Sequence, residues 1–435
     1  MSADAAVPTA LLVGTLDTKG AEYEFVRARL RAAGLEALLL DVGVLGDPAV
    51  VPDISSMEVA EAAGTDLGAL RFTREGSDTR AVALETMQRG ATTIVTRLVD
   101  EGRVHAVFGM GGSGGSQLIS GVMRALPFGM PKLLLSTMAS GDVSGYVGAS
   151  DLALMHSVTD IAGLNRISRP ILENAAGALA GMVAASRSRS VAAMRPAVGI
   201  SMLGVTTAGA TRVARGLEAA GFDAVVFHAV GSGGRAMEAL VQDGVLSAVV
   251  DFTIKEVTDE TIGGIFDAGP ERLRCPSDHG APRVVVPGAV EVINFGALDT
   301  VPQAFRSDSR PLVQHNAHVT AVRATSDELR RVARVVAQRL NESSGAVSVL
   351  VPHGGFDSYA TADGPFADPA GDAAFVEELK ASLRPDIEVE DLDEDINDEA
   401  FTARVLEVAL ELFGGPQSTG RPSEADASPQ REEST

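Results

Sequence analysis

Short apolar runs that alternate with amphipathic stretches are the feature that most restricts how this 435-residue chain can fold. In the first half, runs rich in Val, Leu and Ile predict strands at residues 9–14, 37–42, 104–108, 132–136 and 152–158. Between them, apolar residues recur at the spacing of a helix face, as at Tyr23, Val26 and Leu30. Strands that alternate with helices in this way predict an α/β fold with mainly parallel sheets.

The two halves of the chain begin alike. Residues 14–46 and 204–234 share a glycine turn after a strand, a Leu-x-Ala-Ala-Gly helix end and then a second strand. This weak internal repeat predicts two Rossmann-like lobes, at residues 10–190 and 191–414, with the boundary near the Ser/Arg-rich stretch 186–190. In the second lobe we expect strands at 197–203, 248–251, 283–286 and 347–351, and helices at 326–340, 372–383 and 397–412. Residues 1–9 and 415–435 are predicted to be disordered.

The charge and the cysteine count exclude several classes of protein. The chain carries 58 acidic and 36 basic residues, a net charge of −22, which repels nucleic acid and anionic lipid surfaces. No apolar run approaches the ~18 residues that span a membrane, and the first residues lack the pattern of a signal peptide. One cysteine, Cys275, excludes an intramolecular disulfide. We therefore expect a cytoplasmic protein that binds neither nucleic acid nor membranes.

The first glycine-bounded loop, GTLDTKG at residues 14–20, joins a predicted strand to a predicted helix. It is not a Walker A motif, because Lys19 precedes Gly20 rather than following it. Its position still presents free N–H groups and the positive end of a helix dipole to an anion. Lys19 could add positive charge and Asp17 could bind magnesium, or Asp17 or Thr18 could simply cap the helix.

The second loop, FGMGGSGGSQ at residues 108–117, also lies between a strand and a helix. It contains the G-x-G-x-x-G spacing at Gly109, Gly111 and Gly114. A dinucleotide site would need an acidic residue where the next strand ends, but Ser136 and Thr137 stand there, so NAD is disfavoured. The glycines and nearby hydroxyl groups suit phosphates, although a purely structural glycine turn is the alternative.

The second half repeats these features in GVTTAG (204–209) and VGSGGRAM (230–237), where Arg235 could clamp a carboxylate or phosphate. DFTIKEVTDE (251–260) places Asp251 at a strand end with Glu256 close behind, a pair suited to magnesium or acid/base work, or to a salt-bridged turn.

The pair His315 and His318 lacks the further ligands of a zinc site. The acidic stretch 391–399 lacks the pattern of an EF-hand and suggests a helix entry. A catalytic role for Cys275, with Asp278 and His279 nearby, is a weak alternative.

Nine segments, taken in order, resemble a known protein family. They are GTLDTKG, DVGVLG, PDIS, GMGGSGGSQL, STMASGDVSGYVGASD, VTDIAGLNRIS, FHAVGSGGRAMEAL, VVVPGAVEVINFG and DGPFADP. Together they resemble an uncharacterised bacterial, fungal and plant family that includes the N-terminal ATP-binding module of the tomato mosaic virus resistance protein. The resemblance covers about residues 11–413. It implies a two-lobed protein that binds ATP and Mg²⁺, forms a homodimer or higher homo-oligomer, and works with a TIM-barrel partner protein.

The resemblance also implies site residues. In the first lobe they are Thr15, Asp17, Thr18, Lys19, Gly111, Gly112, Ser113, Gly114, Gly115, Ser136, Thr137 and Asp142. In the second lobe they are Gly231, Ser232, Gly233, Gly234 and Asp251. The chain departs from the family pattern at Ala208-Gly209, where the resemblance implies Pro-Cys, and at His353, where it implies a basic residue.

These observations predict an ATP–Mg²⁺ binding protein whose nucleotide lies at the carboxyl ends of the first-lobe strands, between the lobes. Asp17 and Asp142 are the predicted metal ligands, and Asp251, Glu256 and His353 are the candidate catalytic residues of an ATPase or phosphotransferase. Two alternatives stay open. One is a non-catalytic sensor of a nucleotide or small anion that regulates a partner, and the other is an NAD(P)-dependent oxidoreductase.

Overall fold

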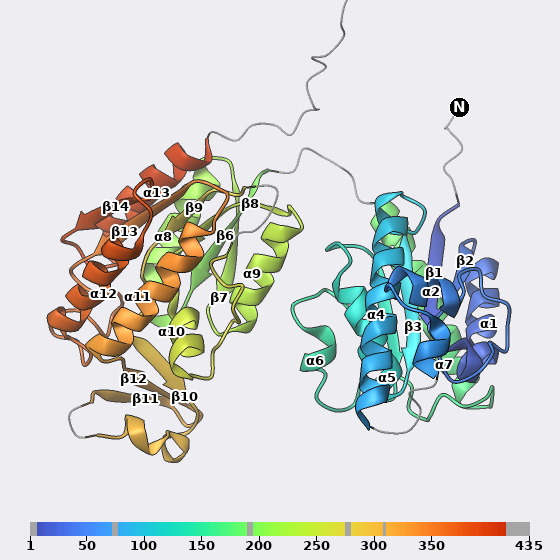
Figure 1. The fold of residues 1–435 in the computed structure, drawn as a ribbon. Helices are drawn as coiled ribbons and strands as arrows, with labels where there is room; N and C mark the ends of the chain where they lie inside the picture. Colours follow the sequence, from blue (N-terminus) through green and yellow to red (C-terminus); the bar gives the residue numbers. More distant parts are fainter. Residues whose placement is uncertain (1–6, 72–76, 189–194, 275–279, 308–309, 415–435) are drawn as a thin grey trace, which may run out of the picture. The chain divides into compact units, whose positions relative to one another are not determined.

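The computed structural model describes residues 7–71, 77–188, 195–274, 280–307 and 310–414. The chain divides into two compact units, residues 1–190 and 191–435, called here the first and second lobes (Figure 1). Each lobe is an α/β sandwich built on a parallel sheet. Cys275, Asp278 and His279, and the predicted disordered tail 415–435, lie outside the described residues.

The first lobe is built on a five-stranded parallel sheet with the strand order β2-β1-β3-β4-β5. The strands are β1 (Thr9–Gly14), β2 (Glu36–Asp41), β3 (Ala106–Gly111), β4 (Lys132–Ser136) and β5 (Ala153–His156). The order reverses at β1, which has β2 on one side and β3 on the other. In open α/β sheets, ligands bind at the carboxyl ends of the strands beside such a reversal.

Helices cover both faces of this sheet, because successive side chains of each buried strand point to opposite faces. Leu12 and Phe108 face α1 (Leu16–Ala32) and α7 (Ser168–Ser188), whereas Leu11 and Val107 face α4 (Ser77–Asp100) and α5 (Ser113–Arg124). Helix α2 (Ser56–Ala62) packs on α4, and α3 (Leu67–Arg71) and α6 (Ser144–Val147) are short. Helices α1 and α5 therefore leave the adjacent strands β1 and β3 toward opposite faces.

The second lobe contains a six-stranded parallel sheet with the order β14-β13-β9-β8-β6-β7. The strands are β6 (Ala197–Met202), β7 (Asp223–His228), β8 (Leu246–Asp251), β9 (Arg283–Val285), β13 (Val347–Pro352) and β14 (Glu388–Leu392). Strand β6 lies between β7 and β8, just as β1 lies between β2 and β3. The predicted fold class, two Rossmann-like lobes with mainly parallel sheets, is confirmed.

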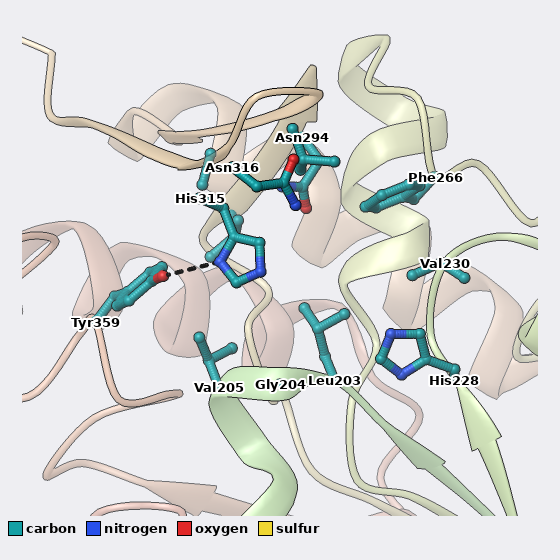
Figure 2. A pocket seen from close by; sticks show the side chains of 13 residues that line it. Leu203, Gly204, Val205, His228, Val230, Phe266, Asn294, His315, Asn316 and Tyr359 are labelled. Atoms are coloured by element: carbon teal, nitrogen blue, oxygen red, sulfur yellow. Dashed lines mark hydrogen bonds between the residues drawn. The ribbon is translucent and has the colours of Figure 1, made fainter. Parts of the chain in front are cut away.

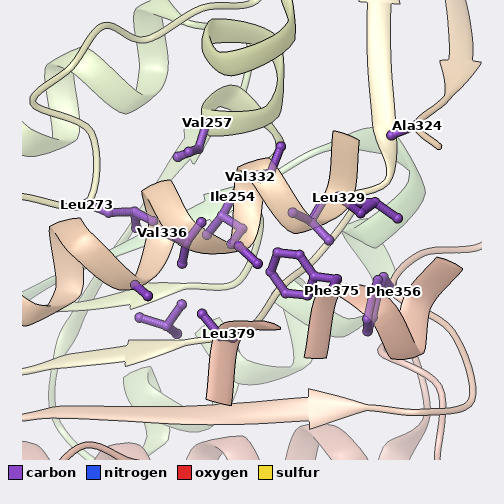
Figure 3. Close-up of a cluster of buried hydrophobic side chains, with 14 of the residues drawn as sticks. Ile254, Val257, Leu273, Ala324, Leu329, Val332, Val336, Phe356, Phe375 and Leu379 are labelled. Atoms are coloured by element: carbon purple, nitrogen blue, oxygen red, sulfur yellow. The ribbon is translucent and has the colours of Figure 1, made fainter. Parts of the chain in front are cut away.

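The helices of the second lobe also form two layers. Helices α8 (Thr207–Ala219) and α13 (Glu399–Phe413) cover one face of the sheet, and α9 (Ser232–Gln242), α10 (Lys255–Ile262), α11 (Ser326–Asn341) and α12 (Pro369–Ser382) cover the other. Figure 3 shows the core beneath α11 and α12, where Val332, Val336, Phe375 and Leu379 lie together. All four side chains are at most 1% exposed, so burial of this apolar surface fixes the two helices on the sheet.

A small antiparallel sheet in the second lobe was not predicted. It has the order β10-β12-β11, with β10 (Val292–Phe295), β11 (Leu312–Asn316) and β12 (Val319–Arg323). Its strands are only four or five residues long, and β11 (LVQHN) carries mostly polar side chains, so the sequence gives little strand signal. Strand β14 was missed for the same reason, and part of it falls in the acidic stretch that we interpreted as a helix entry.

Strand β3 ends later than its apolar pattern predicts. Gly109 and Gly111, the first two glycines of the G-x-G-x-x-G pattern, belong to the strand, and Gly112 alone leads into α5. A Cβ on Gly109 would lie 2.4 Å from Cγ2 of Ile119, so this glycine lets α5 approach the sheet closely. Among the described residues, no helix is long and apolar enough to cross a membrane.

Candidate functional site

The N-terminus of α1 is already occupied by a carboxylate of the protein. Asp41, at the end of β2, accepts hydrogen bonds through Oδ1 from the backbone N–H groups of Leu16 (3.0 Å) and Gly43 (2.9 Å). Asp41 is fully buried, and burial raises the pKa of its carboxyl group. The hydroxyls of Thr15 and Thr18 bond to each other at 2.9 Å. The first predicted phosphate loop is therefore partly filled from within the fold.

The two charged residues of this loop hold neighbouring segments. Asp17 Oδ2 accepts from the N–H groups of Leu45 (2.9 Å) and Gly46 (3.2 Å), and Asp17 Oδ1 is buried without a hydrogen-bond partner. Lys19 Nζ donates to the carbonyl oxygen of Ile161 at 2.8 Å. Both side chains thus connect α1 to loops that follow β2 and β5.

The N-terminus of α5 is different, because none of the described side chains caps it. Gly112 is the N-cap residue, and the first helical hydrogen bond runs from Ser116 N to Gly112 O at 2.8 Å. Within the described part of the chain, the backbone N–H groups of Ser113, Gly114 and Gly115 have no hydrogen-bond partner. The first turn of α5 contains no acidic residue. Free N–H groups and the positive end of the helix dipole make this helix end suited to an anion.

Polar and basic side chains lie next to this open helix end. Thr137 Oγ1 is the atom nearest to where a Cβ on Gly112 would stand, at 3.8 Å, and Arg80 Nη2 is 3.7 Å from the corresponding position on Gly114. Ser136 is buried, and its Oγ bonds to Ser116 Oγ at 2.6 Å and accepts from Met138 N at 3.0 Å. Ser136 therefore holds the end of β4 against α5, whereas Thr137 and Arg80 border the open N–H groups.

The glycine loop of the second lobe is closed by an internal carboxylate. Glu256 Oε1 accepts from the N–H groups of Gly231 (2.7 Å) and Gly234 (3.1 Å) at the start of α9. A Cβ on Gly234 would lie 2.2 Å from Glu256 Oε2, and one on Gly233 would lie 2.0 Å from the carbonyl oxygen of His228. Ser232 is the first residue of α9. These glycines therefore permit close packing, and Glu256 takes the place that an anion would occupy.

Two of the candidate catalytic residues lie in a buried ionic cluster, which consists of Glu238, Asp251, Glu256, Arg272 and Arg283. Arg272 bonds to Asp251 Oδ1 at 2.5 Å and to Glu256 Oε2 at 2.8 Å. Arg283 bonds to Glu238 Oε2 at 2.7 Å and also to Asp251. Asp251 and Glu256 are 0% exposed, so the structure places both carboxylates where they neutralise arginine rather than where a substrate could reach them.

The remaining predicted residues do not join these groups. His353 follows β13 on the surface, and its Nε2 lies 2.8 Å from Asp391 Oδ1. Asp142 is exposed, and its Oδ1 accepts from Ser144 N at 2.9 Å; hydrogen bonds from Ser144 lower the pKa of Asp142. Across the described residues, no group of three or more His, Cys, Asp or Glu side chains could hold a metal ion.

The first departure from the family pattern has a structural counterpart. Gly209 N donates to Asn397 Oδ1 at 2.9 Å, which ties the start of α8 to the segment after β14. A Cβ on Gly209 would lie 2.6 Å from both Ile396 O and Phe252 Cζ. Gly209 is therefore needed for the close contact between α8 and its neighbours in this chain.

Fold and site together define a class: a protein of two doubly wound α/β lobes whose first lobe has an open helix N-terminus at the strand-order reversal. The N-terminal domain described as uncharacterised protein family UPF0261 matches residues 8–188, and its C-terminal domain matches residues 195–413. The chain belongs to the UPF0261 family. The family resemblance recognised from the nine segments is thereby confirmed.

Relatives match most of the chain. A UPF0261 protein of Clostridium tetani is 39% identical over 404 residues, which cover 93% of this chain and 98% of the relative. A UPF0261 protein of Rhizobium meliloti is 41% identical over 372 residues, 86% of this chain and 90% of the relative. The ToMV resistance protein Tm-1(GCR237) of Solanum lycopersicum is 36% identical over 342 residues, 77% of this chain but 45% of that protein.

Several residues that shape these sites were not identified from the sequence. Asp41 caps α1 from the next strand, and Arg272 and Arg283 neutralise Asp251 from distant positions. The position of Asp41 at a strand end, in the segment DVGVLG, is a signal that could have identified it. The two arginines have no comparable local signal, because their partners are 16 to 45 residues away in the sequence.

Proposed function

We propose that the first lobe binds ATP with Mg²⁺ and that the phosphates lie at the N-terminus of α5. The observation that carries this proposal is the contrast between three helix ends. Asp41 fills the end of α1 and Glu256 fills the end of α9, but none of the described carboxylates bonds to the N–H groups of Ser113, Gly114 and Gly115. An uncapped helix end at a strand-order reversal is a common position for phosphate in α/β proteins.

The neighbouring side chains fit a triphosphate. Thr137 supplies a hydroxyl group, and Arg80 supplies a guanidinium that can pair with phosphate oxygens in a bidentate manner. Asp17 Oδ1 is a buried oxygen without a partner, and Asp142 is an exposed carboxylate, so both stay proposed ligands of the Mg²⁺ ion. When bound, the ion would neutralise charge on the phosphates. Lys19 would contribute indirectly, because its hydrogen bond to the carbonyl oxygen of Ile161 holds the loop at residues 161–163 in position.

ATP itself, a homo-oligomer and a TIM-barrel partner protein come from the family resemblance. Whether the protein turns ATP over is a separate question, and the burial of Asp251 and Glu256 favours the second candidate function, a sensor module. A sensor would bind ATP without consuming it and would regulate a partner. Of the three candidate catalytic residues, His353 is the one with an exposed side chain that could act as a base.

Replacing Gly112 with valine is expected to weaken ATP–Mg²⁺ binding at least tenfold without unfolding the lobe. Gly112 has φ −80° and ψ −164°, an extended conformation that valine adopts, and its nearest neighbour to an added Cβ is Thr137 Oγ1 at 3.8 Å. The valine methyl groups would occupy the space over the free N–H groups. Isothermal titration calorimetry should show saturable binding to the wild type and at least tenfold weaker binding to the variant.

A matched control is Gly181→Val in α7, where an added side chain also meets open space but lies in a different helix. Both variants should melt close to the wild type in the absence of nucleotide. Equal ATP affinity of the Gly112→Val variant and the wild type would contradict the proposed site. An assay of inorganic phosphate with excess ATP then separates the two functions, because an enzyme releases phosphate continuously and a sensor releases none.

A further inference from the structure

A cavity of about 260 Å³ lies in the second lobe, at the carboxyl ends of β6 and β7. Its floor is formed by Leu203, Gly204 and Val205, which follow β6, and its roof by residues of the small antiparallel sheet (Figure 2). Strand β6 is the point at which the strand order of this sheet reverses. The cavity therefore has the position in the second lobe where open α/β sheets bind ligands.

Ring side chains surround this cavity. His228 and Phe266 stand on one side, and His315 and Tyr359 on the other, with the Tyr359 hydroxyl 3.5 Å from His315 Nδ1 (Figure 2). Among the described residues, no Lys, Arg, Asp or Glu lines the cavity, so a buried charge on a ligand would find no charged partner among them. The volume lies below the ~300–1,000 Å³ typical of pockets for drug-sized molecules. These properties suit an uncharged molecule with a single flat ring.

One polar group in the cavity wall is left without a partner. Asn294, on β10, is 6% exposed, and its Oδ1 is buried with no hydrogen bond to any of the described residues. Its carboxamide offers both an acceptor and donors. Leaving such a group buried and unpaired is costly, so it calls for a partner that the protein does not supply. A ligand with a donor next to an acceptor on its edge would satisfy both ends of the amide.

A buried ion pair holds this side of the cavity in place. Asp259 Oδ1 accepts from Asn294 N at 2.9 Å, and Asp259 Oδ2 accepts from Phe266 N at 3.0 Å and from Lys255 Nζ at 2.6 Å. Lys255 Nζ also lies 4.7 Å from the centroid of the Phe266 ring. Lys255 and Asp259 are both 0% exposed. One carboxylate thus fixes the backbone of both Asn294 and Phe266, the polar and the ring-stacking elements of the cavity.

We propose that this cavity is a second ligand site, specific for a neutral molecule with one flat ring and adjacent hydrogen-bond donor and acceptor groups. Asn294 pairs with the donor–acceptor edge, and Phe266 and His228 contact the ring. The site is separate from the nucleotide site proposed in the first lobe and does not depend on it. In such a protein, the second lobe recognises a small organic molecule, whereas the first lobe recognises phosphates.

Three probes of the same size separate the features of this site. Benzamide carries a donor beside an acceptor, acetophenone carries an acceptor only, and benzoate carries a charge. We would measure their binding to the full chain by saturation-transfer NMR without nucleotide. Benzamide is expected to bind saturably and at least tenfold more tightly than acetophenone or benzoate.

Asn294→Leu keeps the branched shape and the number of heavy atoms of the side chain and removes its polar atoms. It should weaken benzamide binding at least tenfold while leaving the melting temperature equal to or above that of the wild type, because an unpaired buried amide is removed. The matched control is Gln314→Leu, because the Gln314 amide on β11 is exposed and is not among the residues that line the cavity. This variant should bind benzamide as the wild type does. Absence of saturable benzamide binding to the wild type, or unchanged binding to Asn294→Leu, would overturn the proposal.

Discussion

Replacing Arg272 with methionine is expected to destabilise the second lobe by about 3–5 kcal/mol, the usual cost of removing one partner from a buried ionic group. The Arg272 side chain is 0% exposed and bonds to three carboxylates, those of Glu238, Asp251 and Glu256. Methionine fills a similar volume but leaves Glu256 without its arginine and leaves Asp251 and Glu238 to share Arg283 alone. The three buried carboxylates would then have one cationic partner in the cluster instead of two.

The effect is measurable by urea unfolding followed by far-ultraviolet circular dichroism, since the chain contains no tryptophan for fluorescence. The matched control is Arg330→Met on α11, because Arg330 is 43% exposed and pairs with an Asp327 that is 94% exposed. Exposed pairs of this kind contribute about 0–1 kcal/mol, so the control should unfold almost as the wild type does. An Arg272→Met variant that unfolds at the wild-type urea concentration would show that the cluster does not stabilise the lobe.

This cluster also explains why the second lobe could be only partly predicted. Asp251 was correctly placed at the end of a strand, because an apolar run precedes it. Its neighbourhood could not be predicted, because Arg272 and Arg283 reach it across 21 and 32 residues of sequence. An acid at a strand end has the same local pattern whether it faces a substrate or an internal arginine. Only the packing of α9, α10 and the following segments decides between these environments.

The glycine loops illustrate the same limit. GGSGG at 111–115 and GSGG at 231–234 look alike in sequence, and both precede a helix. They differ in topology, since the first follows β3, beside the strand-order reversal, and the second follows the edge strand β7. They differ in occupancy as well, because Glu256 fills only the second. Strand order and long-range contacts are not encoded in a local motif, so the sequence could not distinguish an open helix end from a closed one.

Local periodicity, in contrast, predicted the strands well. β1 and β4 have the predicted bounds, because their apolar residues are continuous and end at a turn. The cavity at Asn294 was missed because β10 (VINF) is only four residues long and has a single polar residue. Whether the Asn294 amide has a hydrogen-bond partner depends on β11 and β12, which contribute the other residues of the cavity roof. A single polar residue in an apolar run is therefore a useful signal only after its neighbours in space are known.

The stability of the second lobe is expected to fall as the pH rises from about 4 to above 6, because of a buried pair of carboxyl groups. Glu291 and Asp357 are both 0% exposed, and Arg323 and Asp372 are the other charged groups nearby. Burial and the neighbouring Asp357 raise the pKa of Glu291 well above its ordinary value. Burial also raises the pKa of Asp357 from 3.8 to about 6, although a hydrogen bond from Glu291 opposes the rise.

The sign of this effect follows from proton binding. A carboxyl group whose pKa is higher in the folded chain than in the unfolded chain binds more protons when folded, so the free energy of unfolding decreases as pH rises between the two pKa values. The contribution of the pair is therefore most favourable below pH 4 and is lost as the pH passes through the folded pKa values.

Glu291→Gln tests this directly, because glutamine keeps a donor for Asp357 but cannot ionise. The variant should match the wild type near pH 4 and should exceed it at pH 8 by at least about 1.4 kcal/mol, the value of one pKa unit. Urea unfolding at a series of pH values measures the difference, and Glu377→Gln, an exposed glutamate on α12, is the matched control with a wild-type pH profile. If Glu291→Gln were less stable than the wild type at pH 8, Glu291 would have to be ionised in the fold and paired with Arg323.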